Sequence, residues 1–144
     1  MFDIAFQPAA AVTETDVETD GKITVGDHSE TFTASHEVWD RIRYEVQWRE
    51  AADRILGGQP ACFVVDLVSE QQSEYRGECW SVWPEGDVAV VQNQLLLRSA
   101  FEPDQPYAFL PALPQRVTGD GHRVSTWRVT LNHVAAWRQG QASA

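Results

Sequence analysis

Four histidines, two cysteines and one aspartate in an apolar run are the residues of this sequence best suited to chemistry. The histidines fall in expected turns or at helix ends, where histidine is usually solvated: His28, His36, His122 and His133. No serine or cysteine stands with a histidine in a pattern typical of a nucleophile and its base. The sequence therefore predicts no catalytic residue, and we expect the protein not to be an enzyme.

Metal and cofactor sites are equally unsupported. A metal site needs three or four ligands at set spacing, whereas Cys62 and Cys79 stand apart without a CxxC or HxxxH pattern. The glycine-rich motifs that hold nucleotide phosphates are absent from the sequence. We expect neither metal nor cofactor, and we interpret both cysteines as free, buried thiols because no export signal precedes them.

Two features of the central region leave alternatives open. Asp66 is the one acidic residue within the apolar run VVDLV, so it either faces water, pairs with an arginine such as Arg76 or Arg98, or contacts a partner. Trp80 and Trp83 lie three apart in an expected strand and should point to opposite faces. One of them could be exposed as an interface anchor, although packing in the core is the simpler interpretation.

The charge balance constrains the kind of partner. The net charge is −10 with a pI of about 4.7, and the first 37 residues hold eight acidic side chains against the single lysine, Lys22. Such a field repels phosphates, which argues against nucleic-acid binding. It attracts a basic protein and speeds the encounter. The simpler explanation is that the charge serves solubility alone.

Length and hydropathy indicate one domain of 144 residues, with 43% hydrophobic residues and no apolar run of 18 that could span a membrane. The N-terminal residues MFDIAFQPAAAV have no basic segment and contain Asp3, unlike a secretory signal. We therefore expect a cytoplasmic protein that binds neither nucleic acid nor membrane.

The first third of the chain shows the two-residue period of strands. FDIAF, residues 2–6, alternates with Phe2, Ile4 and Phe6 on one side. The acidic segment from 12 to 34 is expected to form strand, turn and strand, with turns at Asp20-Gly21 and Gly26-Asp27. Its inward residues should be Ile23, Val25 and Phe32.

The clearest helix is predicted between Ser35 and Gly58. Ser35 should cap its start, with Glu37 in the first turn, and Gly57-Gly58 should end it with a left-handed residue. Glu45–Arg49 and Glu50–Arg54 are expected as ion pairs on the solvent side. Spacings of three and four define one apolar face, which consists of Tyr44, Trp48, Ala51, Ala52, Ile55 and Leu56.

The remainder alternates between strands and turns. ACFVVDLV, residues 61–68, is almost wholly apolar and should be central in a sheet, and residues 84–87 (PEGD) should form a turn between two strands. In VVQNQLLL, residues 90–97, both strand faces become polar together, which predicts a bulge or strand exit whose amides bond to nearby backbone.

The C-terminal part begins with a proline-rich segment, residues 99–115, which should be held down by its apolar residues Phe101, Tyr107, Phe109 and Leu110. A strand with Trp127 and Val129 should follow. Thr130 should cap a short helix that packs Leu131, Val134 and Trp137 inward, and residues 138–144 should fray. The fold predicted is therefore α+β in a single domain: a curved antiparallel sheet with one long helix on a face and a short C-terminal helix.

The order of motifs resembles a known family. GKITVGDHSETF is followed by YEVQWREAADRILGG, ECWSVWPEGDVAVVQNQLLL, PYAFLP and DGHRVSTW. Together these residues, about 21 to 137, are similar to immunity proteins of bacterial contact-dependent growth inhibition. The sequence departs from the family pattern at two positions, with Arg98 where an acid is usual and His28 where phenylalanine is favoured.

The resemblance implies an antitoxin that binds the C-terminal toxin domain of a cognate exported protein and occludes its active site. Some members of the group neutralise ribonucleases of the pancreatic type, whose active sites are cationic, so the acidic charge suits such a partner. We expect a monomer in a 1:1 complex with a basic toxin domain that is a nuclease.

The toxin-binding site should use carboxylates that project from rigid elements, with a tryptophan as anchor. On these grounds the predicted residues are Asp66, Glu74, Glu78, Trp80, Glu85 and Asp87. The more acidic N-terminal patch should steer the encounter rather than seal the complex; it comprises Glu14, Asp16, Glu18 and Asp20. The alternative function is a small-molecule-binding or hydrolytic enzyme with a pocket near Asp66, Trp83 and Gln92.

Overall fold

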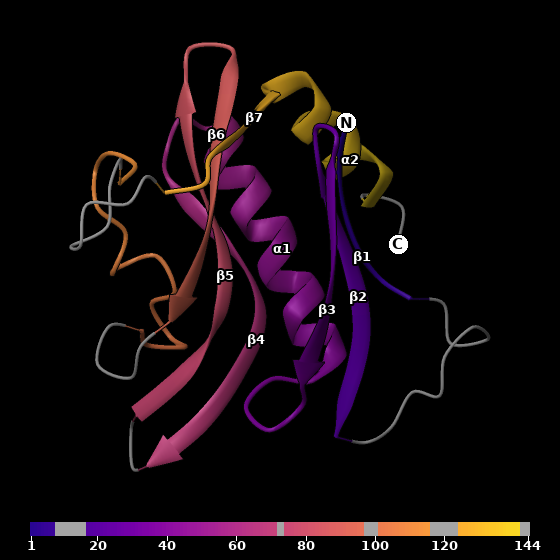
Figure 1. Ribbon diagram of the computed structural model, residues 1–144, viewed down its shortest axis with the longest axis vertical. Coiled ribbons are helices and arrows are strands. Elements are labelled where there is room, and N and C mark those ends of the chain that lie inside the picture. The colour runs from indigo at the N-terminus through magenta and orange to yellow at the C-terminus, as the bar shows by residue number, and fades with distance from the viewer. Residues whose placement is uncertain (8–16, 72–73, 97–100, 116–123, 142–144) are drawn as a thin grey trace.

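Two antiparallel sheets and two helices make up the protein, seen in a computed structural model that describes residues 1–7, 17–71, 74–96, 101–115 and 124–141 (Figure 1). The first sheet has the order β1-β2-β3, formed by β1 (Phe2–Phe6), β2 (Glu18–Val25) and β3 (His28–Ser35). The second has the order β4-β5-β6-β7, formed by β4 (Ala61–Gln71), β5 (Glu74–Glu85), β6 (Val88–Leu96) and β7 (Trp127–Thr130). The helices are α1 (Arg41–Leu56) and α2 (Leu131–Gln141).

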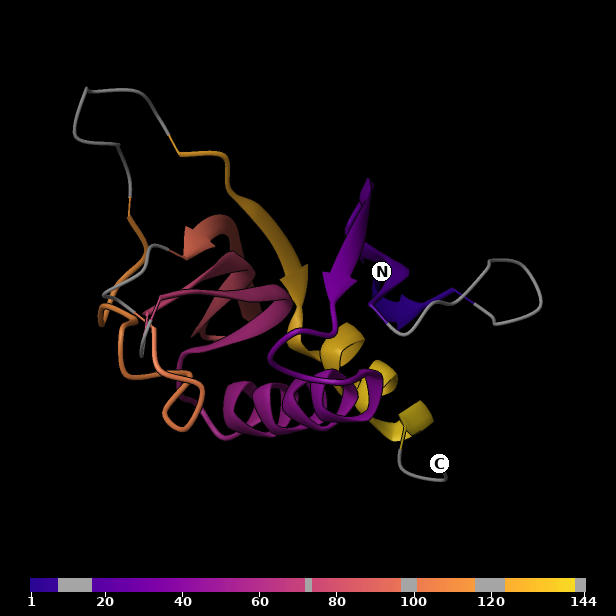
Figure 2. The same cartoon turned by 90° about the horizontal axis from the view of Figure 1, so that it is seen from below.

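The α+β class is confirmed, while the strands expected in one curved sheet are divided between two. Figure 2 shows α1 beneath both sheets, which diverge on the side away from it. The chain leaves β3 through a turn into α1 and then enters β4 of the second sheet. β3 and β4 lie side by side but form no ladder of hydrogen bonds. Neither helix is long and apolar enough in the described residues to cross a membrane.

β4 lies at the edge of its sheet, so the expectation that it is central was wrong. Its continuous apolar pattern has another cause, because other parts of the chain bury it: α1 lies against its edge, Phe63 packs on Phe2 of the first sheet, and Cys62 Sγ contacts Pro106 O. Three side chains of α1 bond to its free backbone: Gln47 joins Cys62 O (2.6 Å) and Val64 N (2.9 Å), Trp48 donates to Val64 O, and Tyr44 Oη accepts from Leu67 N. The QW motif thus covers an edge strand, and Gln47 is fully buried.

The long helix begins five residues later than predicted, and Asp40 rather than Ser35 is its N-cap. Asp40 Oδ1 accepts from Arg43 N at 2.8 Å. Ser35 is otherwise engaged, since its carbonyl accepts from Tyr44 Oη and its hydroxyl from Glu37 N. At the other end Gly58 has the positive φ of +90° expected of a left-handed residue.

The apolar face of α1 is as predicted except at its end, where Leu56 is 40% exposed. The expected ion pairs are replaced by other contacts. Glu45 pairs with Arg41, one turn earlier, at 3.9 Å. The Arg54 guanidinium donates to Pro60 O and lies 4.3 Å from the Tyr107 ring centroid. Arg54 thus joins the end of the helix to the following loop and to the proline-rich segment.

In the first sheet, Asp20-Gly21 is not a turn, because β2 runs straight through it. A Cβ at Gly21 would collide with the Phe32 ring, which explains why glycine stands in this strand. The turn expected at Gly26-Asp27 is confirmed, with a φ of +63° at Gly26. The predicted inward residues of this segment are all buried: Ile23, Val25 and Phe32.

The C-terminal helix α2 packs against β1, the edge strand of the first sheet. His133 N bonds to Thr130 Oγ1, as expected of the cap, and Val134 and Trp137 are buried. Trp137 Nε1 donates to Ile4 O at 3.1 Å. The helix continues to Gln141, so fraying from residue 138 was wrong for residues 138–141, while 142–144 lie outside the described residues.

The amides of β6 lie within a regular strand, without the bulge or strand exit that was predicted. Their bonding to neighbours is confirmed. Gln92 holds the main chain of Gln115 through both amide atoms, and Gln94 Oε1 accepts from Ser81 Oγ at 2.6 Å. The proline-rich segment packs against the core through the four residues expected: Phe101, Tyr107, Phe109 and Leu110.

Candidate functional site

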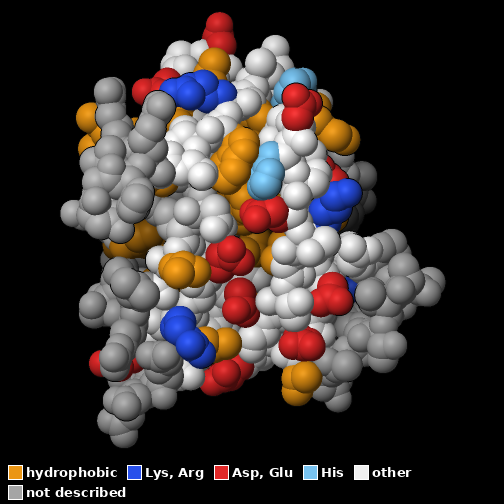
Figure 3. Space-filling view, viewed as in Figure 1, with side chains coloured by type: hydrophobic (Ala, Val, Ile, Leu, Met, Phe, Trp, Pro, Cys, Tyr) orange, Lys and Arg blue, Asp and Glu red, His pale blue; other side chains and the backbone are white. Residues whose placement is uncertain are grey.

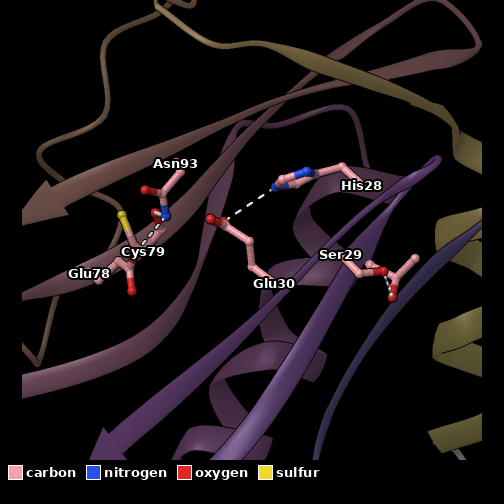
Figure 4. A network of polar contacts seen from close by, with 7 residues as sticks. His28, Ser29, Glu30, Glu78, Cys79 and Asn93 are labelled. Carbon is pink, nitrogen blue, oxygen red and sulfur yellow. Dashed lines mark hydrogen bonds and ion pairs between the residues drawn. The ribbon is translucent and has the colours of Figure 1, made fainter.

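An acidic hollow between the two sheets is the most distinctive surface of the molecule. We call it the inter-sheet groove and define it by His28 and Glu30 of β3, Asp66 of β4, Glu78 of β5 and Asn93 of β6. Figure 3 shows acidic side chains gathered along the middle of this face. Figure 4 shows His28 and Glu30 on one side of the groove and Glu78 and Asn93 on the other.

Strand alternation explains how both sheets contribute. In β3 the buried Phe32 and Ala34 face inward, and His28 and Glu30 share their side. In the second sheet, Glu78 stands opposite Asp66 on one neighbour and Leu95 on the other. Opposed residues of antiparallel strands point to the same face. Leu95, 75% exposed, therefore adds an apolar side chain beside the carboxylates.

The upper end of the groove is floored by aromatic rings. His28 stacks on Trp127 with 4.5 Å between ring centroids and lies 6.1 Å from Trp80. Its Nε2 is 3.4 Å from Glu30 Oε2, close enough for an ion pair but without the geometry of a hydrogen bond. His28 therefore connects the two sheets, contrary to the expectation of a solvated histidine.

Trp80 packs beneath His28 and Trp127. Its side chain is only 1% exposed, so the exposed anchor that was considered for this position was wrong. The ring packs against Trp127 at 5.3 Å and beneath His28. Trp83, on the opposite face of β5, is also buried and donates from Nε1 to Pro111 O.

The carboxylate of Glu78 is held in position by β6. Asn93 Nδ2 donates to Glu78 Oε2 at 3.0 Å and to Cys79 O at 3.4 Å. The Glu78 side chain remains half-exposed. A charged side chain that is already oriented loses less conformational entropy when it binds a cation.

Asp66 has a structural bond as well as a place in the groove. Its Oδ1 accepts from Ser35 N at 2.9 Å, which ties β4 to the end of β3. Partial burial raises the pKa of Asp66, while the Ser35 and Leu67 backbone bonds and the charge of Arg76 oppose the rise. Of the arginine partners considered, Arg76 thus acts on it electrostatically, and Arg98 lies outside the described residues.

The other predicted contact residues occupy the ends of β5. Glu74 shares the face of Glu78 at the start of the strand. Glu85 is the last residue of β5 and shares the face of Trp83, away from Glu78, and Asp87 lies in the β5–β6 turn, where Gly86 has a φ of +60°. In the competing N-terminal patch, Glu14 and Asp16 lie outside the described residues. Asp20, on β2, accepts from Thr33 Oγ1 at 2.7 Å.

Asp20 comes nearer to the groove than its position in the sequence suggested. A hollow of about 470 Å³ runs along β3 and is lined by residues of both sheets: Gln7, Asp20, Thr31, Phe32, Thr33 and Glu78. The N-terminal and central acidic groups were treated as alternatives, but the fold brings Asp20 and Glu78 to a single hollow.

The pocket of the alternative enzyme is not formed. Asp66 faces the inter-sheet groove with Glu78, whereas Trp83 and Gln92 share the opposite face of the second sheet. Gln92 is 1% exposed and engaged with Gln115 and Thr126. These three residues therefore do not converge on one cavity.

The thiols are free and fully buried, as predicted for Cys62 and Cys79. Burial, together with the neighbouring Cys79, raises the pKa of the Cys62 thiol, which makes it a poor nucleophile. Within the described ranges, no group of three or more histidine, cysteine or acidic side chains is arranged to hold a metal ion.

The sequence analysis missed His28 and Glu30 as groove residues. The pattern HSETFTAS could have indicated this, because His28 and Glu30 lie an even number of residues from the inward Phe32 and therefore share its strand face. Their position at a turn and the acidic composition of the segment favoured a solvated strand instead. Only the neighbouring sheet, contributed by residues far along the chain, turns this strand face into one wall of a groove.

Comparisons with known proteins find a matching family model and a similar fold. The model of the family described as the CdiI N-terminal domain matches residues 34–137. The fold is similar to a structure described as the CdiA-CT/CdiI toxin and immunity complex from Enterobacter cloacae, with a TM-score of 0.81, 20% sequence identity and full coverage of both chains. A comparison with curated proteins finds no match.

Proposed function

We propose a partner and a mode of action on the premise that this chain belongs to the CdiI N-terminal domain family, whose model matches well over half of it. The resemblance to contact-dependent inhibition immunity proteins is thereby confirmed, and the protein is an immunity protein. Its action is to bind the C-terminal toxin domain of a cognate effector in the cytoplasm, one to one, and to cover the toxin's active site.

The charge of the protein supports a cationic target. A net charge of −10 on 144 residues favours encounter with a basic surface. An enzyme that cleaves RNA has such a surface, because it must hold the phosphates of its substrate. We therefore assign the toxin to the ribonucleases, with the immunity protein occupying the region that RNA would enter.

The inter-sheet groove carries this proposal. Glu30 and Glu78 project into it from facing strands, Asn93 orients Glu78, and Asp66 lies farther along the same face. Glu74 extends the carboxylates along the same face to the start of β5, and Asp87 lies in the turn at its other end, while Glu85 shares the face of Trp83. Trp80 contributes from beneath as the support of His28 and Trp127 rather than through direct contact.

Charge reversal tests the surface. Glu78→Lys combined with Asp87→Lys should accelerate dissociation from the cognate toxin by tenfold or more, roughly 1.4 kcal/mol or above. Glu50→Lys combined with Glu18→Lys is the matched control, since it changes the net charge equally with residues of α1 and β2. Equal dissociation rates for the two double variants would move the binding site away from the groove.

A separate assay tests the class of toxin. The purified toxin domain should degrade RNA, and one equivalent of this protein should abolish that degradation. Thermal unfolding of each variant must first be shown to match the wild type, so that lost inhibition reports binding. A toxin that is neutralised but leaves RNA intact would remove the ribonuclease assignment while leaving the immunity function in place.

A further inference from the structure

The outer edge of β3 carries backbone groups that point away from its sheet. β3 is the last strand in the order β1-β2-β3. Val17 O accepts from His36 N, and hydrogen-bonded pairs alternate along an antiparallel ladder. The inward residues from His28 to Ala34 therefore bond to β2, and the alternate ones direct their N–H and C=O groups outward: Ser29, Thr31, Thr33 and Ser35.

Only the last of these four residues has its edge groups occupied. Ser35 N donates to Asp66 Oδ1 and Ser35 O accepts from Tyr44 Oη. Among the described residues, no hydrogen bond reaches the backbone groups of Ser29, Thr31 or Thr33. Three successive donor–acceptor pairs of a strand thus remain open to solvent.

Two other edge strands, β4 and β1, receive side-chain bonds at their outer backbone groups, unlike these positions of β3. The edge of β4 bonds to Gln47, Trp48 and Tyr44 of α1. The edge of β1 receives the indole of Trp137 at Ile4 O. An open strand edge is a template for pairing with another chain, so folded proteins usually cover or block it.

The space beside this edge has room for another strand. The hollow of about 470 Å³ lies along Thr31, Phe32 and Thr33 and reaches Glu78 on the second sheet. Glu78 lines this hollow and is half-exposed, and the exposed Glu30 projects from the inward side of β3. Figure 3 shows that acidic side chains dominate the middle of this face.

We propose that an extended, basic segment of the toxin domain pairs with the edge of β3 as an additional strand. The inference rests on the proposed toxin binding and specifies how the contact is made. Side chains of an added strand alternate between faces. Every second residue of the segment faces the groove, where Glu30 and Glu78 select lysine or arginine. A second copy of this protein is disfavoured, because it carries the same charge of −10.

A proline at the edge tests the pairing. Thr31→Pro removes one outward N–H and places a ring where the added strand would lie, but breaks no bond within the sheet, because the Thr31 N–H is outside the ladder. Thr31→Ala keeps the N–H and is the matched control. Thr31→Pro should weaken toxin binding at least about tenfold, while Thr31→Ala binds like the wild type. Both should unfold at nearly the wild-type temperature.

Amide hydrogen exchange, followed by NMR, provides a second readout that needs no mutation. In the free protein the amides of Ser29, Thr31 and Thr33 should exchange fast, while Ser35, bonded to Asp66, is protected. In the toxin complex the first three should slow by about a hundredfold or more. Unprotected amides at these positions in a saturated complex would overturn the proposal.

The outcomes separate this inference from the function it rests on. If the wild-type protein does not bind its toxin, the proposed function fails. If the toxin binds the wild type and Thr31→Pro equally, and the three amides stay unprotected, only the added strand is wrong. If the amides are protected in the free protein and the protein sediments as a dimer, the occupant is a second copy and the basic segment is excluded.

Discussion

At the scale of single residues, Gln92 shows how a buried amide fixes a loop. Its side chain is 1% exposed and bonds to both the N–H and the carbonyl of Gln115. Gln92→Ala should lower the free energy of unfolding by about 1–3 kcal/mol, because two backbone groups lose their partner. Urea denaturation measures the change. Gln105→Ala, at an exposed position, should stay within about 0.5 kcal/mol of wild type.

Asp66 gives a prediction that depends on pH. Burial raises its pKa in the folded protein, so the folded state binds the proton more tightly than the unfolded state does. The ionised carboxylate therefore costs stability above its folded pKa. Asp66→Asn, which keeps an oxygen for Ser35 N, should be more stable than wild type at pH 7. The difference should vanish below the ordinary pKa of an aspartate, as measured by thermal unfolding across pH 3–7.

At the scale of secondary structure, α1 stabilises the edge of β4 through polar contacts as well as apolar packing. Gln47→Met retains the volume of the side chain but leaves Cys62 O and Val64 N without a bond. We expect a loss of about 2–4 kcal/mol from two unpaired buried backbone groups. Guanidinium denaturation measures it. Gln59→Met, at an exposed position past the helix, is the control and should be close to neutral.

The pattern of the sequence predicted most elements but not how they meet. Alternation located β1, the β2–β3 turn and the inward residues of α1, because local geometry alone determines these features. The start of α1 was wrong because Ser35 and Asp40 are both good caps, and tertiary bonds from Ser35 to Asp66 and Tyr44 decide between them. The apolar run predicts a central position for β4, because burial by a helix and burial by a neighbouring strand produce the same pattern.

At the scale of the whole molecule, the acidic charge should govern how fast the complex forms. Association with the toxin should slow by about tenfold or more between 50 and 500 mM salt, because screening shortens the reach of the field. Dissociation should change much less. Stopped-flow fluorescence, with the tryptophans of the groove floor as probes, measures both rates. An association rate constant independent of salt would show that the charge does not steer the encounter.

The groove itself could be predicted only in part. Asp66 and Glu78 were both predicted as contact residues, but only the β4–β5 register, with its irregularity between Val64 and Asp66, sets them opposite each other on one face. The wall formed by His28 and Glu30 depends on how two sheets diverge over α1, which is a long-range property. The burial of Trp80 has the same origin, since His28 and Trp127 cover it from elements at opposite ends of the chain.

The bond from Trp137 to Ile4 joins residues 133 positions apart, and Phe2 packs edge-on against the same indole. A ribosome adding about 5–20 residues per second needs on the order of ten seconds to make the intervening chain. Throughout that time the first strand lacks the helix that completes its core. New synthesis cannot answer an incoming toxin at once, so resistance depends on mature molecules already stored in the cell.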